Sequence, residues 1–194
     1  MIIGITGGTG SGKSTLLKEL EKLGAVVLDC DEIYHELLKT DRALLEAIEK
    51  RFPGTVVDGV LQRKKLGTLV FSDKNALADL NKITHAAISK EVLRRLEGVE
   101  FGAIDAIGLF ESGLAECCQI TVAVTAPHEQ RVLRLMAREG VTREYAQSRI
   151  DAQPDDNWFS GHSDYTLSNA STQADFQSKC LAFFKECGIM KEES

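Results

Sequence analysis

The sequence predicts a three-layer α/β/α fold in which a five-stranded parallel β-sheet is covered by helices on both faces. Five short apolar runs of strand length alternate with stretches of helical periodicity along the 194 residues. A glycine-rich loop joins the first strand to the first helix, an arrangement typical of phosphate-binding (P-loop) NTPases. Residues 41–98 lie between the second and third strands and are mostly helical, so we interpret them as an insertion.

The glycine-rich loop spans Gly7 to Thr15 and contains two glycines five residues apart, followed by Lys13 and Ser14. Glycines permit a tight turn whose backbone N–H groups point at a phosphate, and the following helix N-terminus adds a partial positive charge. Lys13 can reach the outer phosphates of a nucleoside triphosphate, and the Ser14 hydroxyl can bind Mg²⁺. The predicted nucleotide-binding residues are Gly8, Thr9, Gly10, Ser11, Gly12, Lys13, Ser14 and Thr15.

The strands and helices of the α/β core follow in order. The predicted strands are residues 1–6, 25–28, 101–105, 120–125 and 164–168. The predicted helices are residues 14–23, 32–39, 127–139, 142–153 and a closing helix that buries Phe176, Cys180, Phe183 and Phe184. Pro127 suits the first turn of a helix, Gly140 suits a C-terminal cap, and Thr142 suits an N-terminal cap.

Helical periodicity dominates the insertion. Thr55–Val57 is its only predicted strand, Leu61 is placed on a short helix, and a long helix runs from Leu77 to Leu96. We therefore predict a single kinase-like domain with a core of about residues 1–40, 99–126 and 154–194. The helical insertion is about residues 41–98, and a helical lid is about residues 127–153.

The composition is that of an ordinary globular protein. The net charge of −6 gives no electrostatic signature of nucleic-acid binding, and no apolar run is long enough to cross a membrane. The five cysteines form no Cys-x-x-Cys pair, the four histidines show no zinc spacing, and no secretion signal is visible. We expect a cytoplasmic protein without nucleic-acid or membrane partners, acting as a monomer or weak homo-oligomer.

Several classes of protein use a phosphate-binding loop. Asp105–Gly108 matches the short pattern of GTP switch proteins, but no Asn-Lys-x-Asp is present to bind guanine. The small size and helical flaps favour a small-molecule kinase. Asp31, which follows the second strand, is the candidate base, and Asp29 is the candidate cap of the next helix. Arg131, Arg134 and Arg138 stand on one face of the lid helix, where arginines can neutralise a transferring phosphoryl group.

Over nearly its whole length the chain resembles the dephospho-CoA kinase family. The resemblance rests on a combination of motifs: the loop from Thr6 to Thr15, Asp29-Cys30-Asp31, Gly59-Val60-Leu61-Gln62-Arg63 with Leu66-Gly67 and Val70-Phe71, Phe110-Glu111-Ser112-Gly113-Leu114, Gln130 with Arg134 and Arg138, Arg149-Ile150 with Gln153, and Asp164-Tyr165 with Asn169.

The resemblance implies ATP-dependent phosphorylation of the ribose 3′-hydroxyl of dephospho-CoA, giving CoA and ADP with Mg²⁺ as cofactor. It implies that Asp31 is the general base and contacts substrate, and that Lys13 and Arg138 stabilise the phosphoryl charge. Arg134 and Asn169 would lie on the ATP side, with Asn169 near the adenine. The remaining implied residues are Arg63, His85, Glu111 and His35 on the substrate side, Ser14 as a metal ligand, and Asp105 as a more distant neighbour of the metal.

Four positions depart from the family pattern. Ala86 follows His85 where the family usually has proline, and His35 stands where arginine is common. Gly108 lies in the changed segment Asp105–Leu109, and Phe159 stands where a basic residue is expected. Two other functions are compatible with the sequence: a kinase of another nucleoside, nucleotide or small alcohol, and a nucleotide-binding regulator without catalysis.

Overall fold

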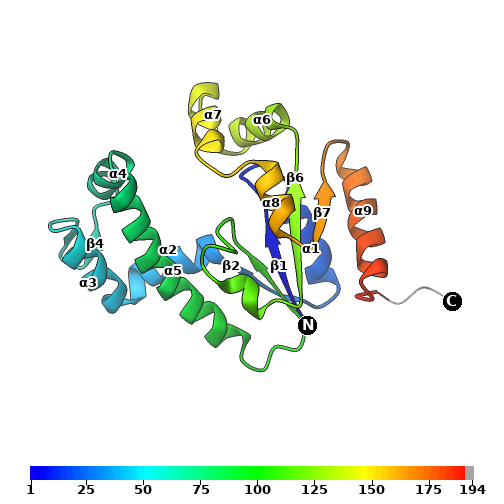
Figure 1. The fold of residues 1–194 in the computed structure, drawn as a ribbon, viewed down its shortest axis with the longest axis horizontal. Coiled ribbons are helices and arrows are strands. Elements are labelled where there is room, and N and C mark those ends of the chain that lie inside the picture. The colour runs from blue at the N-terminus through cyan, green and yellow to red at the C-terminus, as the bar shows by residue number, and fades with distance from the viewer. Residues whose placement is uncertain (191–194) are drawn as a thin grey trace. The chain divides into compact units, whose positions relative to one another are not determined.

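The computed structural model describes residues 1–190, apart from the side chain of Phe71, and the chain divides into two compact units (Figure 1). Unit 1 contains Met1–Val27, Glu100–Phe110 and the chain from Ala115 onward, and unit 2 contains Leu28–Val99 and Glu111–Leu114. Unit 2 thus begins at Leu28, before the start of the predicted insertion. Residues 191–194, which the predicted core includes, lie outside the described residues.

The sheet contains five strands in the order β2-β5-β1-β6-β7. Their bounds are β1 Ile2–Thr6, β2 Val26–Asp29, β5 Gly102–Asp105, β6 Ile120–Thr125 and β7 Tyr165–Ser168. Strand β1 runs parallel to β5 and β6, with Ile3 opposite both Ala103 and Ile120, and β6 runs parallel to β7. The predicted five-stranded parallel sheet is confirmed.

Five helices belong to unit 1: α1 Lys13–Lys22, α6 His128–Glu139, α7 Arg143–Asp151, α8 Asp156–His162 and α9 Gln173–Glu186. A 3₁₀ turn, Leu114–Cys117, lies at the boundary of the two units. Helix α8 is absent from the sequence prediction. Its seven residues are too few to show a period, and its N-terminus is fixed by the Asp155 carboxylate, which accepts a hydrogen bond from the Trp158 N–H at 2.8 Å.

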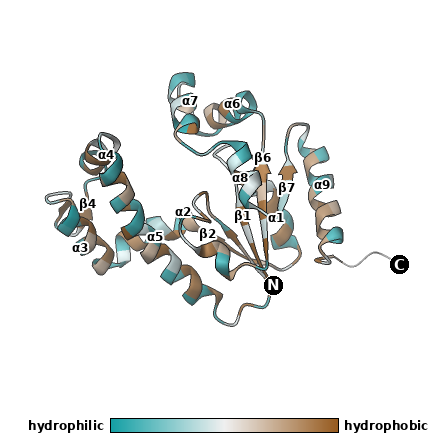
Figure 2. Ribbon diagram, viewed as in Figure 1, coloured by the Kyte–Doolittle hydropathy of each residue, from teal (hydrophilic) through white to brown (hydrophobic). Residues whose placement is uncertain are grey.

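The main core of unit 1 lies where α1 and α9 pack on the sheet. Figure 2 shows the strands as a largely hydrophobic band. The fully buried side chains include Ile3 and Ile5 of β1, Leu16 and Leu20 of α1, and Phe184 of α9. Burying each of these side chains stabilises the fold by roughly 1.5–3 kcal/mol. This packing fixes β1 and α1, the two elements that hold the glycine-rich loop between them.

Helices α6 and α7 form a hairpin with a small core of its own. Val132, Leu135, Ala146 and Ile150 are buried together and form a cluster separate from the main core. The predicted caps are confirmed: Gly140 ends α6 in the left-handed conformation with φ of 67°, and the Thr142 side chain accepts a hydrogen bond from the Tyr145 N–H. The hairpin is therefore held together mainly by its own side chains.

Unit 2 is mostly helical, as the sequence predicts for its insertion. Its helices are α2 Cys30–Thr40, α3 Arg42–Arg51, α4 Arg63–Phe71 and α5 Lys74–Leu96, and α5 packs against the other three. The prediction for Leu61 is wrong: β4 Val60–Leu61 pairs antiparallel with β3 Val56–Val57 instead of starting a helix. The Asp58-Gly59 turn, with φ of 51° and 75°, folds the chain into a hairpin that local helical spacing cannot reveal.

Glu91 of α5 gives unit 2 an acid-sensitive contact. Its carboxylate accepts hydrogen bonds from Arg94 and Arg95, which lower its pKa from 4.5 to about 2. Since the folded pKa is depressed, this stabilisation is present above about pH 4.5 and is lost as the pH falls toward 2. We expect Glu91→Gln to lower the melting temperature at pH 7 by on the order of 2 °C.

Circular dichroism melts between pH 7 and pH 2 check this prediction. The difference between wild type and Glu91→Gln should shrink as the pH falls, because the wild-type carboxylate becomes protonated. Glu21→Gln is the matched control, since Glu21 lies exposed on α1 and its side chain makes no hydrogen bond or ion pair within residues 1–190. A constant difference across this pH range would contradict the assignment.

Within the part of the chain that the structure describes, no helix is both long enough and apolar enough to span a bilayer.

Candidate functional site

The glycine-rich loop connects β1 to α1 and leaves the N-terminus of α1 uncapped by any side chain. The N-cap residue is Gly12, with φ of 104°, and the first turn of α1 carries no acidic residue. The first N–H groups of a helix have no partner within the helix, and they attract anions together with the helix dipole. The loop therefore presents a binding site for a phosphate group, as its sequence predicts.

Two glycines of the loop leave space that the neighbouring side chains fill. A Cβ atom at Gly8 would lie 1.9 Å from Nη2 of Arg131, and one at Gly12 would lie 2.1 Å from Nδ2 of Asn169. Both positions exclude any larger residue unless these neighbours move. The conformation of the loop is thus fixed by close packing against these two side chains as well as by its own backbone.

Lys13 lies against the loop, next to an acidic residue at the end of β5. Its ammonium group donates a hydrogen bond to the Gly7 carbonyl at 2.8 Å and lies 3.7 Å from Oδ1 of Asp105. Both side chains are largely buried, at 12% and 15% exposed. Asp105 therefore pairs with the lysine that is predicted to bind phosphate, and its predicted place near a metal stays a prediction.

Two loop hydroxyls differ in their surroundings. Ser14 is exposed in the first turn of α1, where a metal ion bound to nucleotide phosphates can reach it. The Ser11 hydroxyl is buried and has no hydrogen-bond partner within residues 1–190. In that same range no group of three or more His, Cys, Asp or Glu side chains is arranged to hold a metal. A metal here would depend on phosphate oxygens for most of its ligands.

The predicted ATP-side residues Arg134 and Asn169 contact the carbonyl face of the loop. Arg134 Nη1 donates to the carbonyls of Gly10 and Ser11 at 3.1 and 3.2 Å, and Asn169 Nδ2 donates to Ser11 at 2.8 Å. Arg134 Nη2 also donates to the Asn169 carbonyl, and burial lowers the pKa of Arg134. The two side chains thus hold the Gly10 and Ser11 carbonyls in place.

Arg131 lies on the same face of α6 as Arg134. It is 4% exposed, and its Nε donates a hydrogen bond to the Thr9 carbonyl at 3.0 Å. The sequence places Arg131 in the predicted lid but gives no sign of this hydrogen bond to the loop. Arg138, three turns from the start of α6, does not reach the loop. Its side chain is 62% exposed and pairs with Glu139, which also pairs with Arg149. Helical spacing gives the three arginines one face, but their contacts differ because only the first turns of α6 pack on the loop.

Unit 2 contains the predicted base and the predicted substrate-side residues. Asp29, the last residue of β2, caps α2: its Oδ1 accepts hydrogen bonds from the N–H groups of Asp31 and Glu32 at 2.8 and 3.2 Å. Asp31 is exposed in the first turn of α2, and its carboxylate makes no hydrogen bond or ion pair with any of the described residues. Asp29 thus caps α2 as the sequence suggests, and the role of Asp31 as base stays a prediction.

The other substrate-side residues lie on separate elements of unit 2. His35 is exposed on α2, Arg63 is exposed at the start of α4, and His85 is half-buried in the middle of α5. Glu111 is exposed in the short Glu111–Leu114 segment. Burial raises the pKa of Tyr34, and the positive charge of Arg63 opposes this rise. Helix α5 continues without a break through Ala86, where the family usually has proline.

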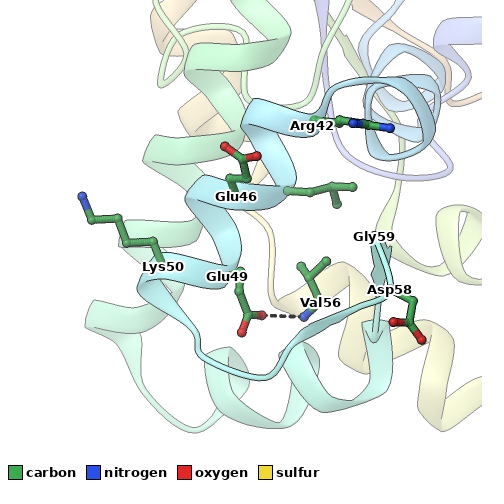
Figure 3. A pocket seen from close by; sticks show the side chains of 8 residues that line it. Arg42, Glu46, Glu49, Lys50, Val56, Asp58 and Gly59 are labelled. Carbon is green, nitrogen blue, oxygen red and sulfur yellow. Dashed lines mark hydrogen bonds between the residues drawn. The ribbon is translucent and has the colours of Figure 1, made fainter.

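Unit 2 also contains a cavity of about 660 Å³ between α3 and the β3–β4 hairpin (Figure 3). Its lining includes Arg42, Leu45, Glu49 and Val56, and the Glu49 carboxylate accepts a hydrogen bond from the Val56 N–H at 2.7 Å. The backbone hydrogen bonds from Gly54 and Val56 lower the pKa of Glu49. None of the residues predicted for the site lines this cavity, so we assign it no part in the reaction.

The Phe159 side chain is apolar and belongs to the protein interior. It is completely buried in α8, and its ring meets the Trp158 ring edge-on at a centroid distance of 5.3 Å. The hydrophobic core therefore occupies the position where a basic residue is expected from the family pattern.

Comparison with known proteins identifies the family. Residues 1–175 match the dephospho-CoA kinase family. The chain is 36% identical over 179 residues to the dephospho-CoA kinase of Corynebacterium diphtheriae, covering 89% of this chain and 90% of that protein. The chain belongs to the dephospho-CoA kinase family.

Solved structures agree with this membership. The dephospho-CoA kinase from Campylobacter jejuni has a TM-score of 0.66 and 28% identity, covering 97% of this chain and 98% of that one. The Thermus thermophilus protein TT1252 has a TM-score of 0.80 and 34% identity, with 96% and 97% coverage. As a member of this kinase family the chain is a phosphotransferase, and the predicted family, fold class and enzyme class are confirmed.

Proposed function

We propose that this protein transfers the γ-phosphoryl group of ATP to the ribose 3′-hydroxyl of dephospho-CoA, giving CoA and ADP. The observation that carries the proposal is the loop itself: an uncapped helix N-terminus, with Lys13 held beside Asp105, in a chain of the dephospho-CoA kinase family. Phosphoryl transfer needs mainly positioning and charge neutralisation, which such a loop supplies.

On the ATP side, the loop N–H groups bind the phosphates and Lys13 neutralises charge on the transferring group. In the free protein Lys13 donates to the Gly7 carbonyl, so binding of ATP exchanges this contact for a phosphate oxygen. The Asp105 carboxylate, 3.7 Å from the ammonium group, holds it near the loop. Arg134 and Asn169 fix the loop from its carbonyl face, and Asn169 is also proposed to lie near the adenine.

Mg²⁺ is the proposed metal cofactor. When bound with the nucleotide, it would neutralise the negative charge that develops during phosphoryl transfer. The exposed Ser14 hydroxyl suits one ligand position, and the absence of a three-residue cluster of metal-binding side chains in residues 1–190 fits an ion that arrives with the nucleotide. Asp105 would act on this ion indirectly, through its pairing with Lys13.

On the acceptor side, Asp31 accepts the proton of the 3′-hydroxyl as general base. Its exposed carboxylate is available because Asp29 caps α2. We propose that dephospho-CoA is bound by Arg63, His85, Glu111 and His35, all of which belong to unit 2. Arg138, exposed and paired with Glu139, would leave this partner to meet the phosphoryl group. The chain contains an odd number of cysteines, five, which suits the cytoplasmic location that we propose.

An assay of coupled ADP release with ATP and Mg²⁺ tests the function. We expect ADP release that depends on dephospho-CoA, with CoA as the product confirmed by mass. ADP release with another nucleoside, nucleotide or small alcohol, and none with dephospho-CoA, would overturn the proposed acceptor. ATP binding without any turnover would instead indicate a nucleotide-binding regulator.

A further inference from the structure

Arg131 of α6 is a buried charge that no proposed step of the reaction uses. Its side chain is 5% exposed, and its three guanidinium nitrogens have three different partners. Nε donates to the Thr9 carbonyl at 3.0 Å, Nη1 donates to Asp156 Oδ1 at 3.2 Å, and Nη2 donates to Gln153 Oε1 at 3.3 Å. Only arginine offers a planar group with donors in these several directions.

Burying the charge of Arg131 costs desolvation free energy, which an apolar side chain in the same place would not. Desolvation lowers the pKa of Arg131 and raises the pKa of Asp156, so burial acts against both charged forms even though the two groups form an ion pair. An apolar pair of similar volume often stabilises a fold as well as a buried ion pair does. The arrangement therefore points to a role in shaping the loop.

The backbone of the loop is fitted closely to Arg131. The Arg131 guanidinium occupies the space beside Gly8, where a Cβ would lie 1.9 Å from Nη2. The Arg131 main chain occupies the space beside Gly10, where a Cβ would lie 2.7 Å from the Arg131 carbonyl oxygen. Arg131 thus packs directly against two glycines of the phosphate-binding loop, Gly8 and Gly10.

Gln153 brings the other end of the α6–α7 hairpin to the same loop residue. Its Oε1 accepts a hydrogen bond from the Thr9 N–H at 2.8 Å, and its Nε2 donates to Thr9 Oγ1 at 2.8 Å. Arg131 lies near the start of the hairpin and Gln153 follows its end, so both ends meet at Thr9. Between these two contacts the hairpin has its own small core of Val132, Leu135, Ala146 and Ile150.

We propose that Arg131 is a positioning residue that sets the conformation of the phosphate-binding loop and, with Gln153, anchors both ends of the lid hairpin to Thr9. In this arrangement any displacement of the base of the hairpin alters the loop that binds the ATP phosphates. The inference rests on the proposed use of the loop for ATP, but it does not depend on which alcohol is phosphorylated.

Direct measurement of MgATP binding by calorimetry, without an acceptor, tests this proposal. Arg131→Met keeps an unbranched apolar stem but removes the guanidinium group, and with it the charge and all three hydrogen bonds. We expect its Kd for MgATP to rise about tenfold or more. In steady-state kinetics the KM for ATP should rise in parallel, while the KM for dephospho-CoA stays within twofold.

Arg131→Lys keeps the charge beside Asp156 but cannot reach the three partners together, so a rise of several-fold in Kd is expected. This variant keeps the test decisive if Arg131→Met does not fold. Arg143→Met is the matched control, because Arg143 lies on α7 and pairs with exposed Glu129 at 2.8 Å, away from the loop. Its Kd should stay within twofold of wild type.

Two results would overturn the proposal: an unchanged Kd for MgATP in the folded Arg131 variants, or an equal rise in the KM of both substrates. A lower melting temperature with normal MgATP binding would likewise reduce Arg131 to a structural contact. Failure of the proposed function gives a different pattern. If dephospho-CoA is not the acceptor, wild type shows no turnover with it, yet the effect of Arg131→Met on MgATP binding remains.

Discussion

Replacing Asp31 with asparagine is expected to lower kcat by about 10²- to 10⁴-fold while the Kd for MgATP stays within twofold of wild type. Asparagine has nearly the same shape but cannot accept a proton from the attacking hydroxyl. The carboxylate is exposed in the first turn of α2 and is not needed as a cap, because Asp29 fills that position. Single-turnover kinetics with saturating ATP and dephospho-CoA measure the effect on the chemical step.

Asp29→Asn is the matched control for this prediction. An asparagine at an N-cap accepts the same hydrogen bonds as aspartate, so α2 keeps its start and kcat should change by no more than about twofold. If Asp29→Asn abolished turnover and Asp31→Asn did not, the base would have to be reassigned to Asp29. Near-normal turnover in both variants would remove the general-base role from this pair of residues.

Replacing Lys13 with alanine is expected to lower kcat/KM for ATP by about 10²- to 10³-fold. The variant loses the positive charge that stabilises the transferring phosphoryl group, and it also removes the cation that lies 3.7 Å from Asp105 Oδ1. Without this cation, the negative charge of Asp105 near the phosphate site repels the nucleotide more strongly. The double variant Lys13→Ala, Asp105→Asn should therefore recover part of the affinity for MgATP without recovering kcat.

Calorimetry and steady-state kinetics on the two variants separate binding from chemistry. Lys22→Ala is the control, since Lys22 ends α1, is exposed and pairs with Glu19 outside the loop, and its kinetics should match wild type. Retention of kcat in Lys13→Ala would mean that another group neutralises the transferring phosphoryl, and the assignment of Lys13 would be wrong.

The local elements of the core could be predicted because each has a short-range signal. Strand β6, Ile120–Thr125, agrees with its predicted bounds, and α6 ends at Gly140 because only glycine adopts the left-handed conformation there without strain. Helix α8 and strand β4 were not predicted. Helix α8 has seven residues and β4 has two, which is too few to show a period. Burial of Phe159 holds α8 in place, and pairing with β3 holds β4.

The candidate site divides in the same way. Sequence alone determined the phosphate-binding loop, the α/β order around it and the pair Asp29 and Asp31, since these depend on residue types at fixed spacing. It could not separate the three arginines of α6, which share one helical face. Only tertiary structure decided that Arg131 is buried and donates a hydrogen bond to the Thr9 carbonyl, and that Arg134 donates to the carbonyls of Gly10 and Ser11. It also decided that Arg138 is exposed. Spacing along a helix fixes the direction of a side chain, whereas its burial and hydrogen-bond partners depend on segments far away in the sequence that pack against it.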